Sequence, residues 1–125
     1  MELIHTALWT DDLEATLAFY TDVLDLDRVW GFTADDGVEN VYVGTESGAE
    51  IQFKYDPDGE SVPDPAGIDH VAIEVEDTDA TYEHVVEETG CEVEVEPVTM
   101  DHIDVRAAFV CDPNGYVVEF VEHLE

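Results

Sequence analysis

The sequence predicts an α+β protein built from two βαβββ modules, and three observations support this fold class. The chain has 125 residues, 45% of them hydrophobic, which is the size and composition of one globular domain. Apolar patterns typical of a strand, a helix and three further strands occur in that order in each half. Residues of the first half also match residues of the second half at two nearly equal offsets, as expected for an internal repeat.

The first offset places His5 over His70 and Asp12 over Asp77. Each half therefore begins with a strand that contains a histidine, followed by an acidic turn and a helix. The second offset places Gln52 over Glu119, and it differs from the first by two residues, which a change in loop length can absorb. The halves are predicted at about residues 1–56 and 67–125, within a single domain. A linker at about 57–66, rich in Pro, Gly and Asp, joins them.

Each predicted element has its own signal. In the first half, a strand over 3–9 is followed by a helix that Asp11 or Asp12 can cap and that runs to about Leu24. In the second half, a strand over 68–76 precedes a helix over 78–89 that ends at Gly90. The remaining strands are predicted near 27–33, 38–44, 49–55, 92–96, 104–111 and 116–122.

The charge of the chain is far from neutral. Three basic residues, Arg28, Lys54 and Arg106, stand against 33 acidic ones, for a net charge of −30. Such self-repulsion opposes the compact state, and about 1 M salt shortens the Debye length to roughly 3 Å and removes most of it. Because acidic residues occur in every segment, we interpret them as adaptation to a halophile's salt-rich cytoplasm. Nucleic acids and anionic membranes are poor partners for such a surface.

No apolar run approaches the roughly 20 residues that cross a bilayer, so we expect a soluble, cytoplasmic protein. The two cysteines, Cys91 and Cys111, are too few for a disulfide framework, and we expect buried free thiols.

Four residues are candidate metal ligands. By strand alternation, His5 shares a face with Ala7, and His70 shares one with Ala72. Glu119 lies between two valines, where a carboxylate is costly unless a cation compensates its desolvation. Gln52 shares its face with charged neighbours and resembles an ordinary solvated position.

Each of these four residues alone has an ordinary structural explanation, and their equivalence in two similar halves is what favours a site. If a pseudo-twofold axis relates the halves, the four side chains converge on one cavity. Two imidazoles, a carboxylate and an amide oxygen suit a divalent ion such as Ni²⁺, Co²⁺, Zn²⁺ or Mn²⁺. The other histidines, His84, His102 and His123, do not share this pattern, and we expect surface roles for His84 and His123.

Three segments resemble those of bacterial-type glyoxalase I (lactoylglutathione lyase), a member of the vicinal-oxygen-chelate superfamily. They are LIHTALWTDDLEATLAFYTDVLDL, GIDHVAIEVEDTDATYE and AAFVCDPNGYVVEFVE, which together cover most of the chain. The resemblance implies paired βαβββ modules forming a curved mixed sheet around a central metal cavity. It also implies metal ligands at His5, Gln52, His70 and Glu119, and a homodimer. Bacterial glyoxalase I usually has Glu where this chain has Gln52.

The activity implied by the resemblance is the isomerisation of a hemithioacetal, formed from a 2-oxoaldehyde and a low-molecular-weight thiol, to a 2-hydroxyacyl thioester. Glu119 is our candidate for the base that moves the proton. Arg28 and Lys54 are the candidates for holding carboxylates of the thiol, although a surface ion pair is the more common role for each.

Three other functions remain open. The set of His, Gln, His and Glu is similar to that of methylmalonyl-CoA epimerase, whose second base would lie near Glu39 or Asn40. The residues His5, His70 and Glu119 alone also form the set of an Fe²⁺ dioxygenase. Finally, related proteins such as the bleomycin-resistance proteins bind ligands without catalysis, and fold alone does not decide between these functions.

Overall fold

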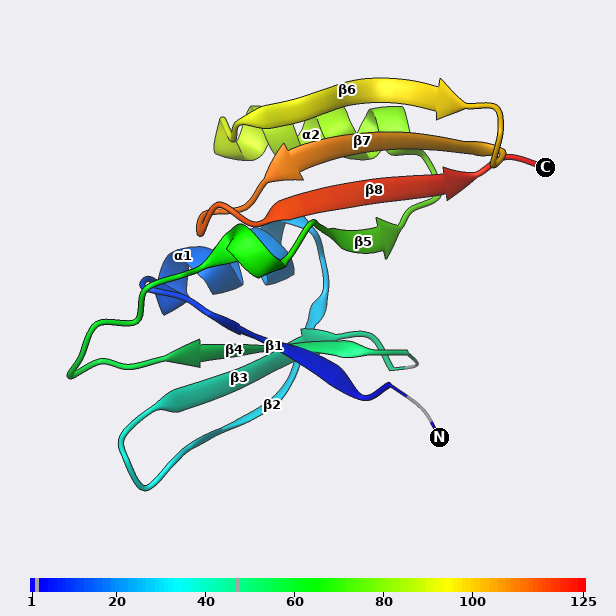
Figure 1. Ribbon diagram of the computed structural model, residues 1–125. Coiled ribbons are helices and arrows are strands. Elements are labelled where there is room, and N and C mark those ends of the chain that lie inside the picture. Colours follow the sequence, from blue (N-terminus) through cyan, green and yellow to red (C-terminus); the bar gives the residue numbers. More distant parts are fainter. Residues whose placement is uncertain (2, 47) are drawn as a thin grey trace. The chain divides into compact units, whose positions relative to one another are not determined.

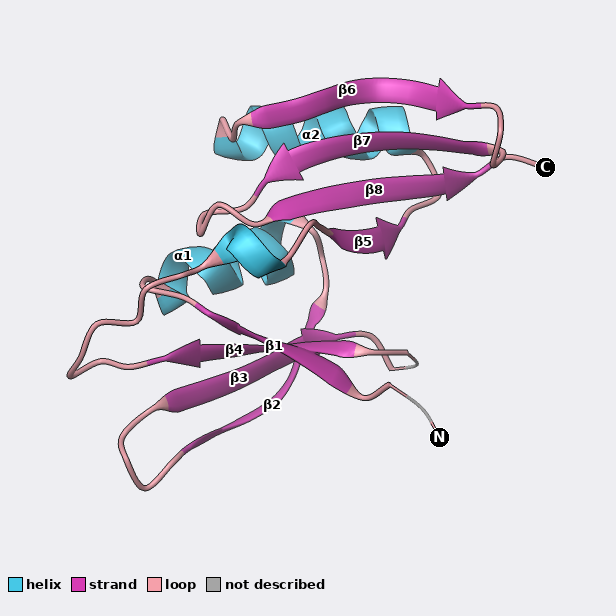
Figure 2. Cartoon of the chain, in the orientation of Figure 1, coloured by secondary structure: helices cyan, strands magenta, loops and turns pink. Residues whose placement is uncertain are grey.

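The computed structural model describes residues 1, 3–46 and 48–125 and divides the chain into two compact units, residues 1–64 and 65–125. Each unit has a four-stranded mixed sheet and one main helical segment (Figures 1 and 2). This architecture confirms the predicted α+β class and the two βαβββ modules.

In the first unit, one strand and one helix precede a three-stranded meander. The helix α1 continues directly into a π-helical segment, η1, in which the backbone N–H of Leu24 donates to the carbonyl oxygen of Phe19 at 3.0 Å. The sheet order is β1-β4-β3-β2, with β1 parallel to β4 and the other pairs antiparallel. The elements are β1 (His5–Trp9), α1 (Leu13–Leu17), η1 (Ala18–Val23), β2 (Asp27–Thr33), β3 (Glu39–Gly44) and β4 (Glu50–Tyr55).

The second unit repeats this plan. Its sheet order is β5-β8-β7-β6, again with the first strand parallel to the last one in sequence and the others antiparallel. Helix α2 covers one face of this sheet (Figure 1). The elements are η2 (Pro65–Gly67), β5 (Val71–Glu74), α2 (Thr78–Thr89), β6 (Val93–Met100), β7 (Val105–Cys111) and β8 (Val117–His123).

The predicted helix starts are confirmed at equivalent positions. Asp12 and Asp77 both have extended backbones, and each side chain accepts a hydrogen bond of 3.0 Å from the backbone N–H three residues later. This is the N-cap interaction that satisfies one of the free N–H groups of the first turn. Gly90 ends α2 with φ of +62°, in the left-handed region that favours glycine.

Two predicted strand boundaries were wrong by three residues or more. Strand β6 extends to Met100, whereas the prediction ended it before Pro97. The extension is possible because β6 is the edge strand and its register shifts between Val95 and Val98, where a proline costs no ladder hydrogen bond. Strand β5 begins only at Val71, so His70 directly precedes the strand instead of lying within it.

The core of each unit lies between the sheet and its own helical segment. In the first unit, the buried rings of Tyr20 on η1 and Phe53 on β4 have centroids 4.9 Å apart. In the second unit, Val85 on α2 is fully buried, as are Val118 and Phe120 on β8. Successive side chains of a strand point to opposite faces of the sheet. The residues directly before and after these buried strand residues therefore lie on the face turned away from the helix, which we call the far face of each sheet.

With three Lys and Arg residues against 33 acidic ones, ion pairs can engage only a small part of the acidic charge. Arg106 forms a bidentate pair with Asp79, with N···O distances of 2.6 and 2.9 Å, and this guanidinium lowers the pKa of the Asp79 carboxyl. The side chains at both ends of this pair are 31% and 49% exposed, so the pair contributes little to stability. Screening by salt is therefore the main way to relieve the repulsion.

We predict that the melting temperature rises by roughly 10 °C or more between 0.1 and 1 M KCl, because the Debye length falls from about 10 to 3 Å. For a chain of this size such a shift corresponds to about 2–3 kcal/mol. Thermal unfolding followed by circular dichroism measures it, with sucrose at equal osmolality as a control that stabilises without screening. An unchanged or lower melting temperature at 1 M KCl would show that charge repulsion does not limit stability.

Candidate metal centre

The far face of the first sheet carries His5 and Gln52. Strand β1 runs parallel to β4 in a register that sets Ala7 opposite Gln52, so His5 lies two residues before the partner of Gln52. On the other side, Tyr42 of β3 is directly opposite Gln52. The imidazole of His5 meets the ring of Tyr42 edge-on, with centroids 5.3 Å apart and planes at 81°.

The far face of the second sheet repeats this arrangement with His70 and Glu119. The register of β5 and β8 sets Ala72 opposite Glu119, so His70 again lies two residues before the partner of the candidate ligand. Phe109 of β7 is directly opposite Glu119. The imidazole of His70 meets the ring of Phe109 edge-on, with centroids 5.6 Å apart and planes at 90°.

The two units therefore share their local geometry, in addition to the order of their elements. In each unit a histidine is held edge-on to an aromatic ring, and that ring is paired with the second candidate ligand. The sequence alignment at two offsets already matched the histidines and the ligands. The matching aromatic pair, Tyr42 and Phe109, follows from the second offset but has no chemical signal of its own in the sequence.

In the second unit the two candidate ligand atoms lie side by side. Nε2 of His70 is 3.1 Å from Oε1 of Glu119, whose side chain is only 13% exposed. Nδ1 of His70 is 2.7 Å from Oδ2 of Asp69. An ionised carboxylate only accepts, so each contact can be a hydrogen bond donated by a ring N–H. A cation could replace the proton between Nε2 and Glu119, where both atoms would then act as acceptors, while the proton on Nδ1 stays.

This pair of acceptors fits a shared cation. Ligand atoms bound at about 2.0–2.1 Å to an ion lie about 2.8–3.0 Å apart in octahedral geometry and about 3.3–3.4 Å apart in tetrahedral geometry. The 3.1 Å between these two atoms lies between these values. A carboxylate on the outer nitrogen of a histidine, as Asp69 is here, is also the usual support of a metal-binding imidazole. The chemistry of the donors and their spacing therefore suit a divalent ion.

Gln52 is not the solvated residue that its neighbours in sequence indicated. It is 8% exposed, and its Nε2 donates to Oδ1 of Asn40 at 2.8 Å. The same oxygen accepts a bond of 2.9 Å from Nζ of Lys54. The amide oxygen of Gln52 is thus the atom left for a ligand, and a cationic side chain lies next to it on the far face.

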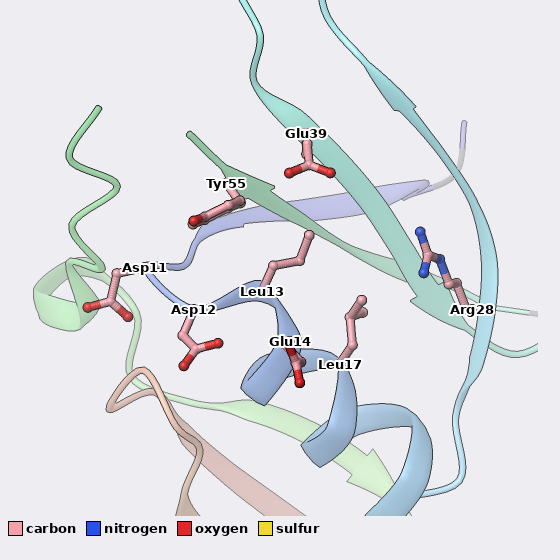
Figure 3. A pocket seen from close by; sticks show the side chains of 8 residues that line it. All are labelled: Asp11, Asp12, Leu13, Glu14, Leu17, Arg28, Glu39 and Tyr55. Carbon is pink, nitrogen blue, oxygen red and sulfur yellow. The ribbon is translucent and has the colours of Figure 1, made fainter. Parts of the chain in front are cut away.

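The two candidate anchors for a thiol carboxylate lie on opposite faces of the first sheet. Lys54 lies on the far face, with Nζ 5.4 Å from the centroid of the Trp9 ring. Arg28 is opposite the buried Val43 and lines a cavity of about 530 Å³ on the helix side (Figure 3). Only Lys54 shares a sheet face with Gln52, so Lys54 is the better candidate for contact with an anionic substrate group.

The cavity on the helix side is mainly acidic. Its lining side chains come from the start of α1 and from β2, β3 and β4 (Figure 3). They are Asp11, Asp12, Leu13, Glu14, Leu17, Arg28, Glu39 and Tyr55. None of the four candidate ligands lines this cavity.

Other polar groups of the second unit already have structural partners. Asp77, Asp79 and Glu122 bring carboxylate oxygens close together at the start of α2. Asp77 caps the helix, Asp79 pairs with Arg106, and Glu122 accepts from the backbone N–H of Thr78 at 3.0 Å. These bonds explain the cluster as a part of the helix start.

The remaining histidines and cysteines lie outside the ligand pairs. His123 pairs with Glu74 at 3.2 Å on the surface, and His102 lies in the exposed turn after β6. Both cysteines are free, as expected, but only Cys111 is buried. Burial, together with a contact to Glu94, raises the pKa of the Cys111 thiol to about 11, so it is protonated at neutral pH.

Within the described part of the chain, no helix is both long and apolar enough to cross a membrane.

Comparison with known proteins shows relatives in sequence and in fold. The chain is 32% identical over 128 residues to lactoylglutathione lyase of Haemophilus influenzae, covering 98% of this chain and 93% of that protein. In fold it is similar to glyoxalase I of Zea mays, with a TM-score of 0.86 and 22% identity over 99% of this chain. It spans 45% of the length of that maize chain.

The same fold also occurs in a protein described as antibiotic binding, TnmS3 of Streptomyces sp. CB03234, with a TM-score of 0.77 and 17% identity over 98% of this chain and 96% of that one. Residues 2–120 match the family model of the Glyoxalase/Bleomycin resistance protein/Dioxygenase superfamily. The repeated βαβββ units and this match lead to one conclusion: the chain belongs to the glyoxalase/bleomycin resistance protein/dioxygenase superfamily.

Proposed function

We propose that this protein is a metal-dependent lyase of the glyoxalase I type, which isomerises the hemithioacetal of a 2-oxoaldehyde and a thiol to a 2-hydroxyacyl thioester. The observation that carries the proposal is the pair of side chains His70 and Glu119, with ligand atoms 3.1 Å apart and Asp69 behind the imidazole. The name of the Haemophilus relative supports the same reaction.

The proposed ligands are His5, Gln52, His70 and Glu119, and the proposed ion is Ni²⁺, Co²⁺, Zn²⁺ or Mn²⁺. When bound, such an ion supplies a positive charge that stabilises negative charge developing on substrate oxygens. We further propose that the protein acts as a cytoplasmic homodimer on a small-molecule substrate. Sedimentation in 1 M KCl measures the assembly state.

Glu119 is the proposed base. Its carboxylate takes the proton from the carbon that bears the sulfur and the hydroxyl group, and returns it to the neighbouring carbonyl carbon, through an enediolate. The hydroxyl proton passes to the other oxygen, so substrate and product are isomers. The low exposure of Glu119 limits competition from water, and Asp69 is hydrogen-bonded to the outer nitrogen of the imidazole beside it.

The structure weakens the case for epimerase chemistry. That reaction needs a second carboxylate base, and Glu39 was the nearest candidate in sequence. Glu39 lines the cavity on the helix side of β3, whereas Gln52 occupies the far face (Figure 3). Asn40, on the correct face, is an amide and cannot accept the proton as a carboxylate would.

We predict that the protein purified in 1 M KCl contains about one Ni, Co, Zn or Mn ion per chain, and that the His5→Ala/His70→Ala variant contains none. Mass spectrometry for metals measures both, with His102→Ala/His123→Ala as the control that removes two histidines elsewhere. Iron in place of these metals would favour a dioxygenase. If reloading also gives no stoichiometric metal, a binding protein without metal is the better account.

We predict that Glu119→Gln lowers kcat for methylglyoxal plus thiol by roughly 10²- to 10⁴-fold, because the amide cannot take the proton. Glu74→Gln is the matched control, since Glu74 lies on the same sheet face as Glu119. It is opposite Val121 of β8, the strand that carries Glu119. Metal content and circular dichroism are recorded on each sample, so that lost metal or lost fold is not mistaken for lost base. Glu119→Gln with full activity and bound metal would exclude Glu119 as the base.

A further inference from the structure

Asn40 is a buried amide on the far face of the first sheet. It lies on β3, is 1% exposed and is directly opposite Lys54 of the neighbouring strand. A buried amide must form hydrogen bonds to offset its desolvation, so its partners determine which way it is turned.

Three bonds fix the orientation of Asn40. Its Nδ2 donates to the carbonyl oxygen of Val38 at 3.1 Å, and its Oδ1 accepts from Gln52 at 2.8 Å and from Lys54 at 2.9 Å. An ammonium group has only donors, and a carbonyl has only acceptors. Rotating the Asn40 amide by 180° would therefore set two donors against each other at Lys54 and two acceptors against each other at Val38.

The fixed Asn40 in turn fixes Gln52. Because Oδ1 of Asn40 accepts only, the group that Gln52 turns toward it must be its NH₂ group, and Oε1 is left for another ligand. The orientation matters because a metal ion binds the oxygen of an amide and is repelled by the NH₂ group. An unsupported glutamine could present either end.

The second unit has no counterpart to this arrangement, and none is needed there. Ala107 occupies the position equivalent to Asn40, opposite Val121 in place of Lys54. Its candidate ligand, Glu119, is a carboxylate with two chemically equivalent oxygens, so either end can bind an ion. An orienting partner thus occurs at the amide ligand, where orientation has a chemical consequence, and is lacking at the carboxylate.

The geometry points to a role for Asn40 as a positioning residue, which, together with Lys54, keeps the amide oxygen of Gln52 directed at the metal ion. This inference rests on the proposed function, since it assigns Gln52 as a ligand. It gives Asn40 no contact with the ion or with the reacting atoms.

The decisive experiment is a comparison of Asn40→Leu in two backgrounds, with Zn²⁺ affinity measured by chelator competition in 1 M KCl. With Gln52 present, we expect Asn40→Leu to weaken Zn²⁺ binding by about 10- to 100-fold, the usual effect of removing a support of a metal ligand. In the Gln52→Glu background we expect a change of about twofold or less, because a carboxylate has no wrong end. Equal losses in both backgrounds would overturn the inference.

Two controls separate positioning from folding. Thr16→Val removes a buried hydrogen bond of similar depth on the helix side, between Thr16 and Thr10 at 2.8 Å, and should leave Zn²⁺ affinity unchanged. Asn40→Asp keeps an acceptor for Gln52 and Lys54, so it should retain most of the affinity. If Asn40→Leu does not fold, loss of affinity in Asn40→Asp equal to that of Gln52→Ala overturns the inference.

Nuclear magnetic resonance of the metal-free protein tests the amide orientation independently of any ion. We expect slowed hydrogen exchange of the Gln52 side-chain NH₂ group in the wild type and its loss in Asn40→Leu. Free exchange in the wild type would refute the positioning role. Failure of the wild type to bind Zn²⁺ would instead refute the proposed metal site, so the two failures are distinguishable.

Discussion

The parallel pairing of the first and last strands within each unit is the constraint on which the candidate site depends. In both units this pairing sets an alanine opposite the second candidate ligand and places the histidine two residues earlier on the same face. A slip of one residue in either register would turn one ligand toward the helix and the hydrophobic core. Aspartate caps at the two helix starts, Asp12 and Asp77, mark where each chain segment leaves the first strand. The matching placement of the candidate ligands in the two units thus follows from one strand register used twice.

The chain has only three Lys and Arg residues to set against its 33 carboxylates. The three cations have separate roles: Arg106 joins β7 to α2, Arg28 lies among carboxylates on the helix side, and Lys54 bonds to the buried Asn40. Lys54 is thus the cation near a candidate ligand in the first unit. A thiol with several carboxylates would find little positive charge there, which makes the identity of the thiol a question of charge as well as shape.

Sequence patterns predicted most of the fold, because apolar periodicity, helix caps and internal repetition are local signals. They failed where partners come from distant strands. Gln52 resembled a surface residue because its partner, Asn40, lies twelve positions away on the neighbouring strand. Arg28 and Trp30 should share a face by simple alternation, but a register shift between them turns Arg28 toward the helix side and Trp30 toward Tyr42. Such a bulge has no clear signal in a single sequence.

X-ray absorption at the zinc edge of the loaded protein reports directly which atoms surround the ion. We expect scattering from two imidazoles with the remaining ligands oxygen, and one imidazole fewer after His5→Ala. The buried thiol of Cys111, with its pKa raised to about 11, should not contribute. A sulfur shell, or an ion surrounded by oxygen alone, would contradict the assignment of His5, Gln52, His70 and Glu119 as the ligands.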